Sequence, residues 1–200
     1  GETSVGLVWD TRLVQPQGAT PLEKLTNFLH ANPLTREMLE HAEPVEGDCR
    51  YLGTLPYFLD KFIAPGWTCV GDAGGFLDPF YSPGSDFIAM SNTYITELIA
   101  KDRAGEEFAP YARAYEQVYF SFYESTLALY TEQYPIFGNP EVMPVKVIWD
   151  YTYYWGVLAQ IWYQRRLTDL NSLSRLRSEL AQALARLRDH GFRGVLVTGD

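Results

Sequence analysis

The sequence contains little cysteine and little histidine. Of its 200 residues, two are Cys (Cys49 and Cys69) and three are His. Two thiols are too few for a disulfide framework or a zinc site, so a reducing compartment such as the cytoplasm is expected. His30, His41 and His190 are far apart and have no metal-ligand spacing. We therefore predict no metal site.

Long apolar runs and an excess of positive charge are absent as well. No window holds 18 uninterrupted apolar residues, and the opening GETSVGLVWD lacks a basic region followed by an apolar stretch. Neither a membrane span nor a secretion signal is therefore expected. With 16 basic and 25 acidic residues the formal charge is −9, which disfavours a nucleic-acid-binding surface over the whole chain. The first residue is Gly rather than Met, which favours a piece of a longer protein.

The residues present favour one or two compact domains with a sizeable core, since 46% are apolar and 15% aromatic. The first seventy residues are predicted to alternate strands and helices. We expect a buried strand over 4–9, a helix over 21–30 capped by Thr20, a short helix over 34–41, and strands over 51–58 and 67–70.

From Ser85 onward the pattern becomes helical. Aromatic residues recur with a period near 3.6 over 108–134, and the segments 143–167 and 171–190 also read as helices, the last with Asn171 as its cap and a leucine stripe. Aromatic stripes of this kind favour helix–helix core over a pocket for a planar ligand. The predicted fold class is α+β and predominantly helical. We place the domain boundary between residues 104 and 105.

One dense motif, WTCVGDAGGFLDPFYSPG, spans residues 67–84. An apolar strand is followed by a turn of small residues, an Asp-Pro turn and a glycine that begins a long helix. The glycines at 71, 74 and 75 let backbone approach a ligand, Asp72 offers a carboxylate to a hydroxyl, and amides near Gly84 can hold an anion. This layout suits a polyhydroxylated, phosphate-bearing cofactor. The alternative is a set of ordinary turns in which Asp72 caps a helix.

The run is similar to the second flavin motif of FAD-dependent monooxygenases of the para-hydroxybenzoate hydroxylase type. It is most similar to flavin-dependent halogenases and their oxidoreductase relatives, in which GDAxxFxDPxxSxG recurs. The resemblance covers roughly residues 3–100 and implies the C-terminal portion of that fold. It implies that Asp72 accepts a hydrogen bond from the ribityl chain of FAD, and that Gly71 and Ala73 on either side of Asp72 shape the backbone there. It further implies that Asp78 and Pro79 set the loop beside the isoalloxazine ring, and that main-chain amides near the flavin pyrimidine come from Ser82, Pro83, Gly84 and Ser85.

The sequence departs from the family pattern in three respects. The first flavin motif, GxGxxG, is absent, as are the lysine and the WxWxIP segment of halogenases. All of these are expected N-terminal to these residues. Within the motif, Pro83 stands before Gly84 and has no N–H for a halide, and Tyr81 stands where tryptophan-type halogenases have an acidic side chain.

The resemblance implies part of a flavin-dependent oxidoreductase, either a halogenase or a monooxygenase. It would act on an aromatic or carrier-bound organic substrate through reduced FAD and dioxygen, with a separate flavin reductase as a candidate partner. No catalytic residue is assigned, and these residues alone are expected to be inactive. One alternative is a non-catalytic helical interaction module that has kept a flavoprotein core. A second is a reductase acting on a prenyl chain, for which a long apolar tunnel would be evidence.

Overall fold

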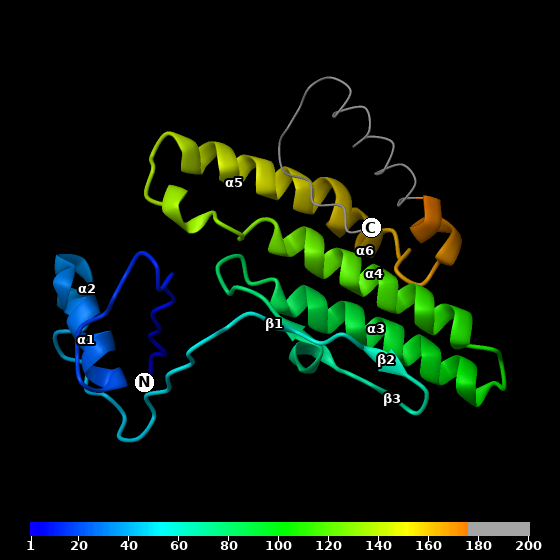
Figure 1. Cartoon of the computed structure of the whole chain (residues 1–200), viewed down its shortest axis with the longest axis horizontal. Helices are drawn as coiled ribbons and strands as arrows, with labels where there is room; N and C mark the ends of the chain where they lie inside the picture. Colours follow the sequence, from blue (N-terminus) through cyan, green and yellow to red (C-terminus); the bar gives the residue numbers. More distant parts are fainter. Residues whose placement is uncertain (176–200) are drawn as a thin grey trace. The chain divides into compact units, whose positions relative to one another are not determined.

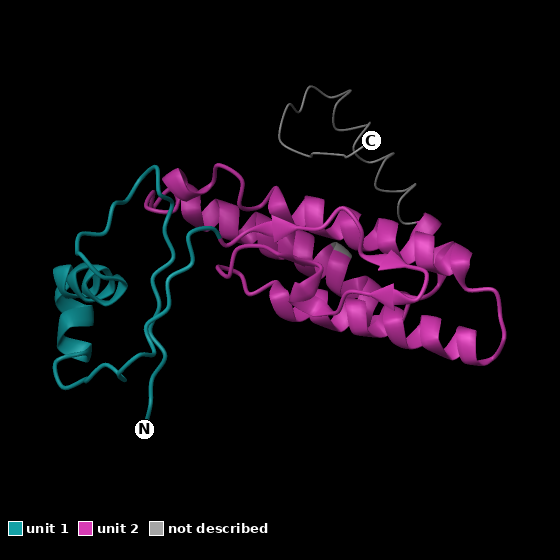
Figure 2. Ribbon diagram, turned by 60° about the horizontal axis from the view of Figure 1, so that its bottom comes forward, with its two compact units in different colours: residues 1–54 teal, residues 55–200 magenta. Residues whose placement is uncertain are grey.

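The computed structural model of the chain describes residues 1–175 (Figure 1). It divides into two compact units, residues 1–54 and 55–200 (Figure 2). The expected domain boundary between residues 104 and 105 lies inside the second unit. There it separates two long helices, α3 (Gly84–Arg103) and α4 (Ala109–Leu127), that pack against each other.

The first unit contains the helices α1 (Pro21–Ala31) and α2 (Pro33–Met38). Thr20 accepts a hydrogen bond from the Glu23 amide, and the Glu23 side chain accepts one from the Thr20 amide, so the predicted cap is confirmed as a capping box. The Asn32 side chain caps α2 by accepting hydrogen bonds from the Leu34 and Thr35 amides. The strand expected over residues 4–9 is wrong, because this segment is irregular and has no strand of the unit to pair with.

The strands of the second unit are short. β1 (Tyr57–Phe58) pairs antiparallel with β4 (Gly75–Phe76), and β2 (Ile63–Ala64) pairs antiparallel with β3 (Trp67–Thr68). The predicted strands over 51–58 and 67–70 are thus present only as two-residue segments. A 3₁₀ turn, η1 (Gly71–Ala73), lies between β3 and β4.

Helices dominate the second unit, as predicted. After α3 the chain reverses at Gly105, whose φ of 71° suits glycine; here the Glu106 amide bonds the Lys101 carbonyl at 2.9 Å and closes the helix end. The helix expected over 108–134 stops at Leu127, because the Leu129 and Tyr130 amides bond carbonyls three residues back instead of four. A 3₁₀ turn, η2 (Tyr134–Ile136), comes next.

The segment expected as one helix over 143–167 is divided into three. α5 (Val142–Tyr153) passes through a π-helical turn, η3 (Tyr154–Leu158), into α6 (Ala159–Tyr163). Residues 170–175 are helical again, but their cap is Asp169 rather than Asn171: its carboxylate accepts hydrogen bonds from Asn171 and Ser172. Of the predicted leucine stripe, Leu173 is described and is buried, and the other members lie beyond Arg175, outside the described residues.

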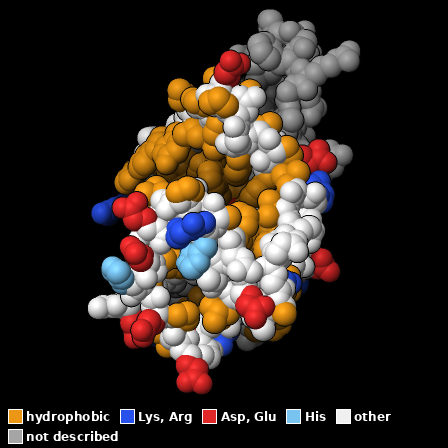
Figure 3. Space-filling model, turned by 90° about the vertical axis from the view of Figure 1, so that its left-hand side faces the viewer, with side chains coloured by type: hydrophobic (Ala, Val, Ile, Leu, Met, Phe, Trp, Pro, Cys, Tyr) orange, Lys and Arg blue, Asp and Glu red, His pale blue; other side chains and the backbone are white. Residues whose placement is uncertain are grey.

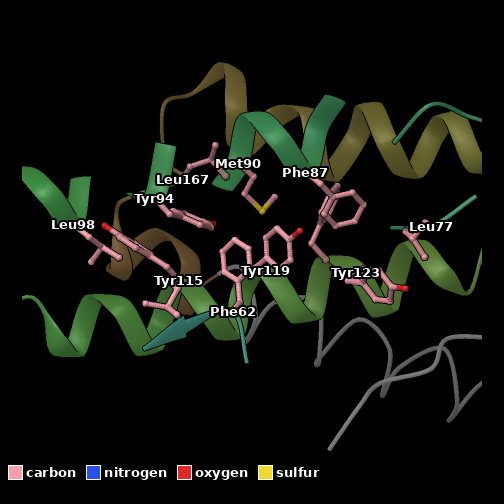
Figure 4. Packing of buried hydrophobic residues seen from close by; sticks show 12 residues of the cluster. Phe62, Leu77, Phe87, Met90, Tyr94, Leu98, Tyr115, Tyr119, Tyr123 and Leu167 are labelled. Atoms are coloured by element: carbon pink, nitrogen blue, oxygen red, sulfur yellow. The ribbon is translucent and has the colours of Figure 1, made fainter. Parts of the chain in front are cut away.

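The core lies between α3, α4 and the short strands (Figure 4). Tyr94 of α3 stacks on Tyr115 of α4 with ring centroids 4.4 Å apart, and Tyr119 of α4 stacks on Phe62 at 4.0 Å. All four side chains are fully buried. The interpretation of the aromatic stripe as helix–helix core is therefore confirmed for these positions.

The surface also carries many apolar side chains. Figure 3 shows hydrophobic side chains gathered in broad areas between single charged ones. Along α5 and α6, large side chains such as Ile148, Trp149 and Tyr163 are exposed. Even so, no helix within residues 1–175 is both long and apolar enough to cross a membrane.

Candidate functional site

The turn η1, which contains Gly71, Asp72 and Ala73, is fastened to both long helices. The Gly71 amide donates to the Ser91 hydroxyl of α3 at 3.1 Å. Glu116 of α4 accepts hydrogen bonds at 2.9 Å from the Phe62 and Ile63 amides, which holds the β2–β3 hairpin leading into the turn. The backbone of the motif is thus set by α3 and α4.

The strands that flank η1 are also held in place. Tyr123 of α4 donates to the carbonyls of Tyr57 and Phe76, on the paired strands β1 and β4. The Tyr57 hydroxyl in turn donates to the carbonyl of Asp72. Because Tyr57 bonds the backbone carbonyl of Asp72 and not its side chain, the Asp72 carboxylate remains available to other partners.

The motif glycines permit close packing on the core. A Cβ at Gly74 would lie 2.5 Å from the Phe62 ring, one at Gly75 would lie 2.7 Å from the Phe58 ring, and one at Gly71 would lie 2.8 Å from Ile88. Gly71 also has a φ of 53°, which suits glycine. Where a side chain would stand, these glycines therefore face protein atoms rather than open space.

Asp72 and Gly84 are twelve residues apart in sequence but adjacent in the structure. The Asp72 side chain is exposed, and its Oδ1 lies 3.8 Å from the position that a Cβ of Gly84 would take. Among the residues that the structure describes, nothing donates a hydrogen bond to this carboxylate. Asp72 thus serves neither as a helix cap nor as an internal brace.

The N-terminus of α3 presents free donors at the same place. Gly84 begins the helix as predicted, and Pro83 before it provides no side-chain cap. The Asp86 and Phe87 amides bond the Pro83 carbonyl, whereas the Gly84 and Ser85 amides have no acceptor within residues 1–175. Uncapped amides at the positive end of a 20-residue helix favour an anion or a polarised carbonyl.

The loop between β4 and α3 contains Asp78, Pro79 and Ser82. Asp78 Oδ1 accepts from the Phe80 amide at 2.8 Å, and its Oδ2 accepts from the Tyr134 hydroxyl. Pro79 and Ser82 are exposed and joined by a turn in which the Ser82 amide donates to the Pro79 carbonyl at 3.0 Å. Ser82 has a φ of 55°.

Tyr81 is held by a charged pair on α5. Its hydroxyl donates to Asp150 Oδ2 at 2.9 Å, and Lys146 Nζ lies 2.6 Å from the same oxygen. Burial, together with the charge of Asp150, raises the pKa of the Tyr81 phenol, which therefore stays protonated as a donor. Tyr81 thus does not replace the acidic side chain of tryptophan-type halogenases, because its hydroxyl is already committed.

The sequence analysis did not identify these partners, nor Tyr134 and Ser91. A signal existed for Lys146 and Asp150, which are the only charged residues in α5 and stand four residues apart, on one helix face. No sequence pattern of this kind indicated that Tyr134 or Ser91 would contact the motif.

Tyr119 of α4 has a buried hydroxyl. Its side chain is fully buried, and its hydroxyl oxygen has no hydrogen-bond partner among the residues that the structure describes. Burial raises the pKa of this phenol, and the nearby charge of Asp72 raises it further.

The structure thus brings together a free carboxylate, two free amides and a loop with exposed Pro79 and Ser82. A ribityl chain offers hydroxyl donors, and a flavin pyrimidine offers carbonyl acceptors. The residues present therefore fit that part of the cofactor. Within residues 1–175, no group of three or more His, Cys, Asp or Glu side chains could hold a metal ion.

Comparison with known proteins finds three relatives whose sequences are similar to part of this chain. The chain is 24% identical over 159 residues to the flavin-dependent halogenase chlA of Dictyostelium discoideum, which covers 78% of this chain and 26% of the relative. It is 32% identical over 90 residues to the flavin-dependent halogenase gsfI of Penicillium aethiopicum, covering 42% and 17%.

The third relative is a 1H-pyrrole-2-carbonyl-[peptidyl-carrier protein] brominase of Pseudoalteromonas luteoviolacea. It is 30% identical over 77 residues, covering 38% of this chain and 19% of the relative. The chain thus spans about a quarter or less of the length of these relatives. The predicted relationship to flavin-dependent halogenases is confirmed. No family model matches the chain, and no solved structure does so either.

Proposed function

We propose that this chain, a sequence relative of flavin-dependent halogenases, forms the ribityl and ring side of a flavin site in an FAD-dependent oxidoreductase. In this proposal Asp72, between Gly71 and Ala73, accepts hydrogen bonds from the ribityl hydroxyls. The loop containing Asp78, Pro79, Ser82 and Pro83 lies beside the ring, and the amides of Gly84 and Ser85 donate to the pyrimidine carbonyls. The chain would correspond to the C-terminal portion of a para-hydroxybenzoate hydroxylase-like fold.

The observation that supports this proposal most strongly is the meeting of Asp72 with the start of α3. A free carboxylate and free amides are opposite hydrogen-bonding groups, and here Asp72 Oδ1 lies 3.8 Å from where a Cβ of Gly84, the first residue of α3, would stand. A ligand that satisfies both must carry donors and acceptors a short distance apart. The junction between a ribityl chain and a flavin ring has this property.

When bound, reduced FAD would supply the reaction with dioxygen that oxidises a halide or an organic substrate. The residues of this chain would bind and orient the cofactor. The positive end of α3, with the Gly84 and Ser85 amides, would stabilise negative charge on the pyrimidine side. Because Pro83 has no N–H, a halide would have to compete with the pyrimidine carbonyls for the Gly84 and Ser85 amides.

The substrate proposed is an aromatic or carrier-bound organic molecule. Its support is the carrier-bound pyrrole in the name of the brominase relative. A separate flavin reductase is proposed as a partner that would deliver reduced flavin. The adenosine half of FAD would need a GxGxxG loop, and these 200 residues contain none.

Because these residues lack the GxGxxG loop for the adenosine half, a flavin-binding test can be specific for the ribityl and ring side. Riboflavin, FMN and FAD share the ribityl chain and the ring, so this chain should bind all three with dissociation constants within about threefold of one another. Quenching of flavin fluorescence on titration with the protein measures this. If none of the three flavins is quenched, the proposal is wrong and the interaction-module alternative is favoured.

The variant Asp72→Asn tests the carboxylate itself. A hydrogen bond to a charged group contributes about 1.5–3 kcal/mol, so flavin affinity should fall about tenfold or more. Asp60→Asn is the matched control, because Asp60 is an exposed carboxylate of the same unit outside the motif. Equal affinity in the two variants would contradict the assigned role of Asp72.

A further inference from the structure

The loop that precedes α3 is strained at Ser82. Its φ of 55° lies in the left-handed region, which is sterically unfavourable for a residue with a Cβ. Ser82 also precedes a proline, and the proline ring favours an extended conformation for the residue before it. Two effects therefore oppose this conformation, while only one hydrogen bond, from the Ser82 amide to Pro79, supports it within the loop.

The bend at Ser82 is anchored through its sequence neighbour Tyr81, whose hydrogen-bond partner lies outside the loop. Tyr81 donates to Asp150, 69 residues away on α5. Lys146 donates to the same Asp150 oxygen and, at 2.9 Å, to the carbonyl of Leu129. The side chains of Lys146 and Asp150 are only 8% and 5% exposed. The anchor is therefore a buried ion pair with a phenol attached.

Stability alone is a poor explanation for this ion pair. Burying two charges costs desolvation energy, and apolar side chains of similar size are often as stabilising. The rest of α5 consists of apolar, aromatic and Thr side chains, so an apolar pair would match its neighbours. What an apolar pair cannot do is accept a hydrogen bond from Tyr81 at a defined point.

We propose that Lys146, Asp150 and Tyr81 are positioning residues that hold the strained Ser82 bend and so keep the Gly84 and Ser85 amides beside Asp72. The inference rests on the proposed function for the ligand of those amides. The anchor itself can be tested without any ligand.

The first experiment measures hydrogen exchange of the Ser82 amide by NMR in the full 200-residue chain. Tyr81→Phe removes the hydroxyl and leaves the ring, so exchange at Ser82 should become about tenfold faster. Tyr115→Phe is the control, because it also removes one phenol hydrogen bond, at 3.2 Å to the Thr168 carbonyl, away from the loop. Unchanged exchange in Tyr81→Phe would overturn the inference.

Asp150→Asn provides the conservative variant. Its side-chain oxygen still accepts from Tyr81 but carries no charge, so exchange at Ser82 should lie between wild type and Tyr81→Phe. Combining Tyr81→Phe with Asp150→Asn should accelerate exchange at Ser82 by less than the product of the two single effects, because both variants weaken the contact between Tyr81 and Asp150. Additive effects would show separate roles and contradict the shared anchor.

Riboflavin titration then links the anchor to the site. Tyr81→Phe should weaken binding about fivefold or more, whereas Tyr115→Phe should bind as wild type does. If the wild-type chain binds no flavin, the proposed function fails, while the exchange comparison still decides the anchor. If wild type binds and Tyr81→Phe binds equally well despite faster exchange, the positioning role is overturned.

Discussion

Helices α1 and α3 are stabilised in opposite ways. α1 has a capping box and a proline in its first turn, yet none of its residues is buried. α3 has no side-chain cap, but Phe87, Met90, Ser91, Tyr94 and Leu98 are buried along it. The same contrast separates the two units, since no residue of 1–54 is buried and the aromatic core lies in the second unit.

The amides at a helix start are free only where the helix does not need them for its own cap. A helix without a buried face depends on local hydrogen bonds, and its terminal amides are then used by its own cap. A helix held by tertiary packing can leave those amides free. The start of α3 beside Asp72 can therefore remain uncapped, because the packing of Tyr94 and the other buried side chains already stabilises the helix.

The largest expected effect comes from removing a core ring. Phe62→Ala deletes a fully buried ring stacked on Tyr119 and should destabilise the second unit by about 3–5 kcal/mol. Leu34→Ala, at a position 65% exposed in α2, should change stability by about 0.5 kcal/mol or less. Urea unfolding of both variants measures the difference. Equal losses would remove the contrast between the units.

A smaller effect is expected from adding one methyl group. Gly74→Ala would place a Cβ 2.5 Å from the Phe62 ring, so overpacking should cost about 1–3 kcal/mol. Gly138→Ala is the control, because no atom lies within 4 Å of its added Cβ. If both variants unfold at the same denaturant concentration, the motif glycine is not needed for packing.

Stability of the second unit should also depend on pH through Glu116. Burial raises the pKa of this carboxyl, but hydrogen bonds from Ile63, Lys61 and Phe62 outweigh it and hold the pKa below its ordinary 4.5. Because the folded pKa is lowered, the contribution is complete above 4.5 and is lost as pH falls through the folded value. Unfolding of wild type and Glu116→Gln compared over this range should converge in acid. A constant difference would contradict the assignment.

The smallest effect should be local to α1. Thr20→Ala removes one half of the capping box and should cost about 1 kcal/mol of helix stability. Amide exchange should accelerate in the first turn of α1 and remain unchanged at Tyr115 and Tyr119 of α4. Faster exchange in both places would mean that the helices of the two units are not stabilised separately.

Prediction from the sequence succeeded where the signal lies within a few residues. Thr20, Pro21 and Glu23 together indicated the start of α1, and Gly84 indicated the start of α3. It failed for the strand over residues 4–9, because an apolar run becomes a strand only where another strand offers hydrogen bonds. It also placed the end of α4 seven residues too late, since the aromatic spacing continues through turns.

The sequence by itself determined the motif of residues 67–84, its relationship to flavin-dependent halogenases and the local cap of α1. Only the tertiary structure decided that Asp72 meets Gly84, that the motif glycines face the core, and that Tyr81 is held by Asp150 and Lys146. The physical reason is the sequence separation of the interacting atoms. A cap or a turn is decided by atoms three or four residues apart, whereas a contact across 69 residues exists only after the helices have packed.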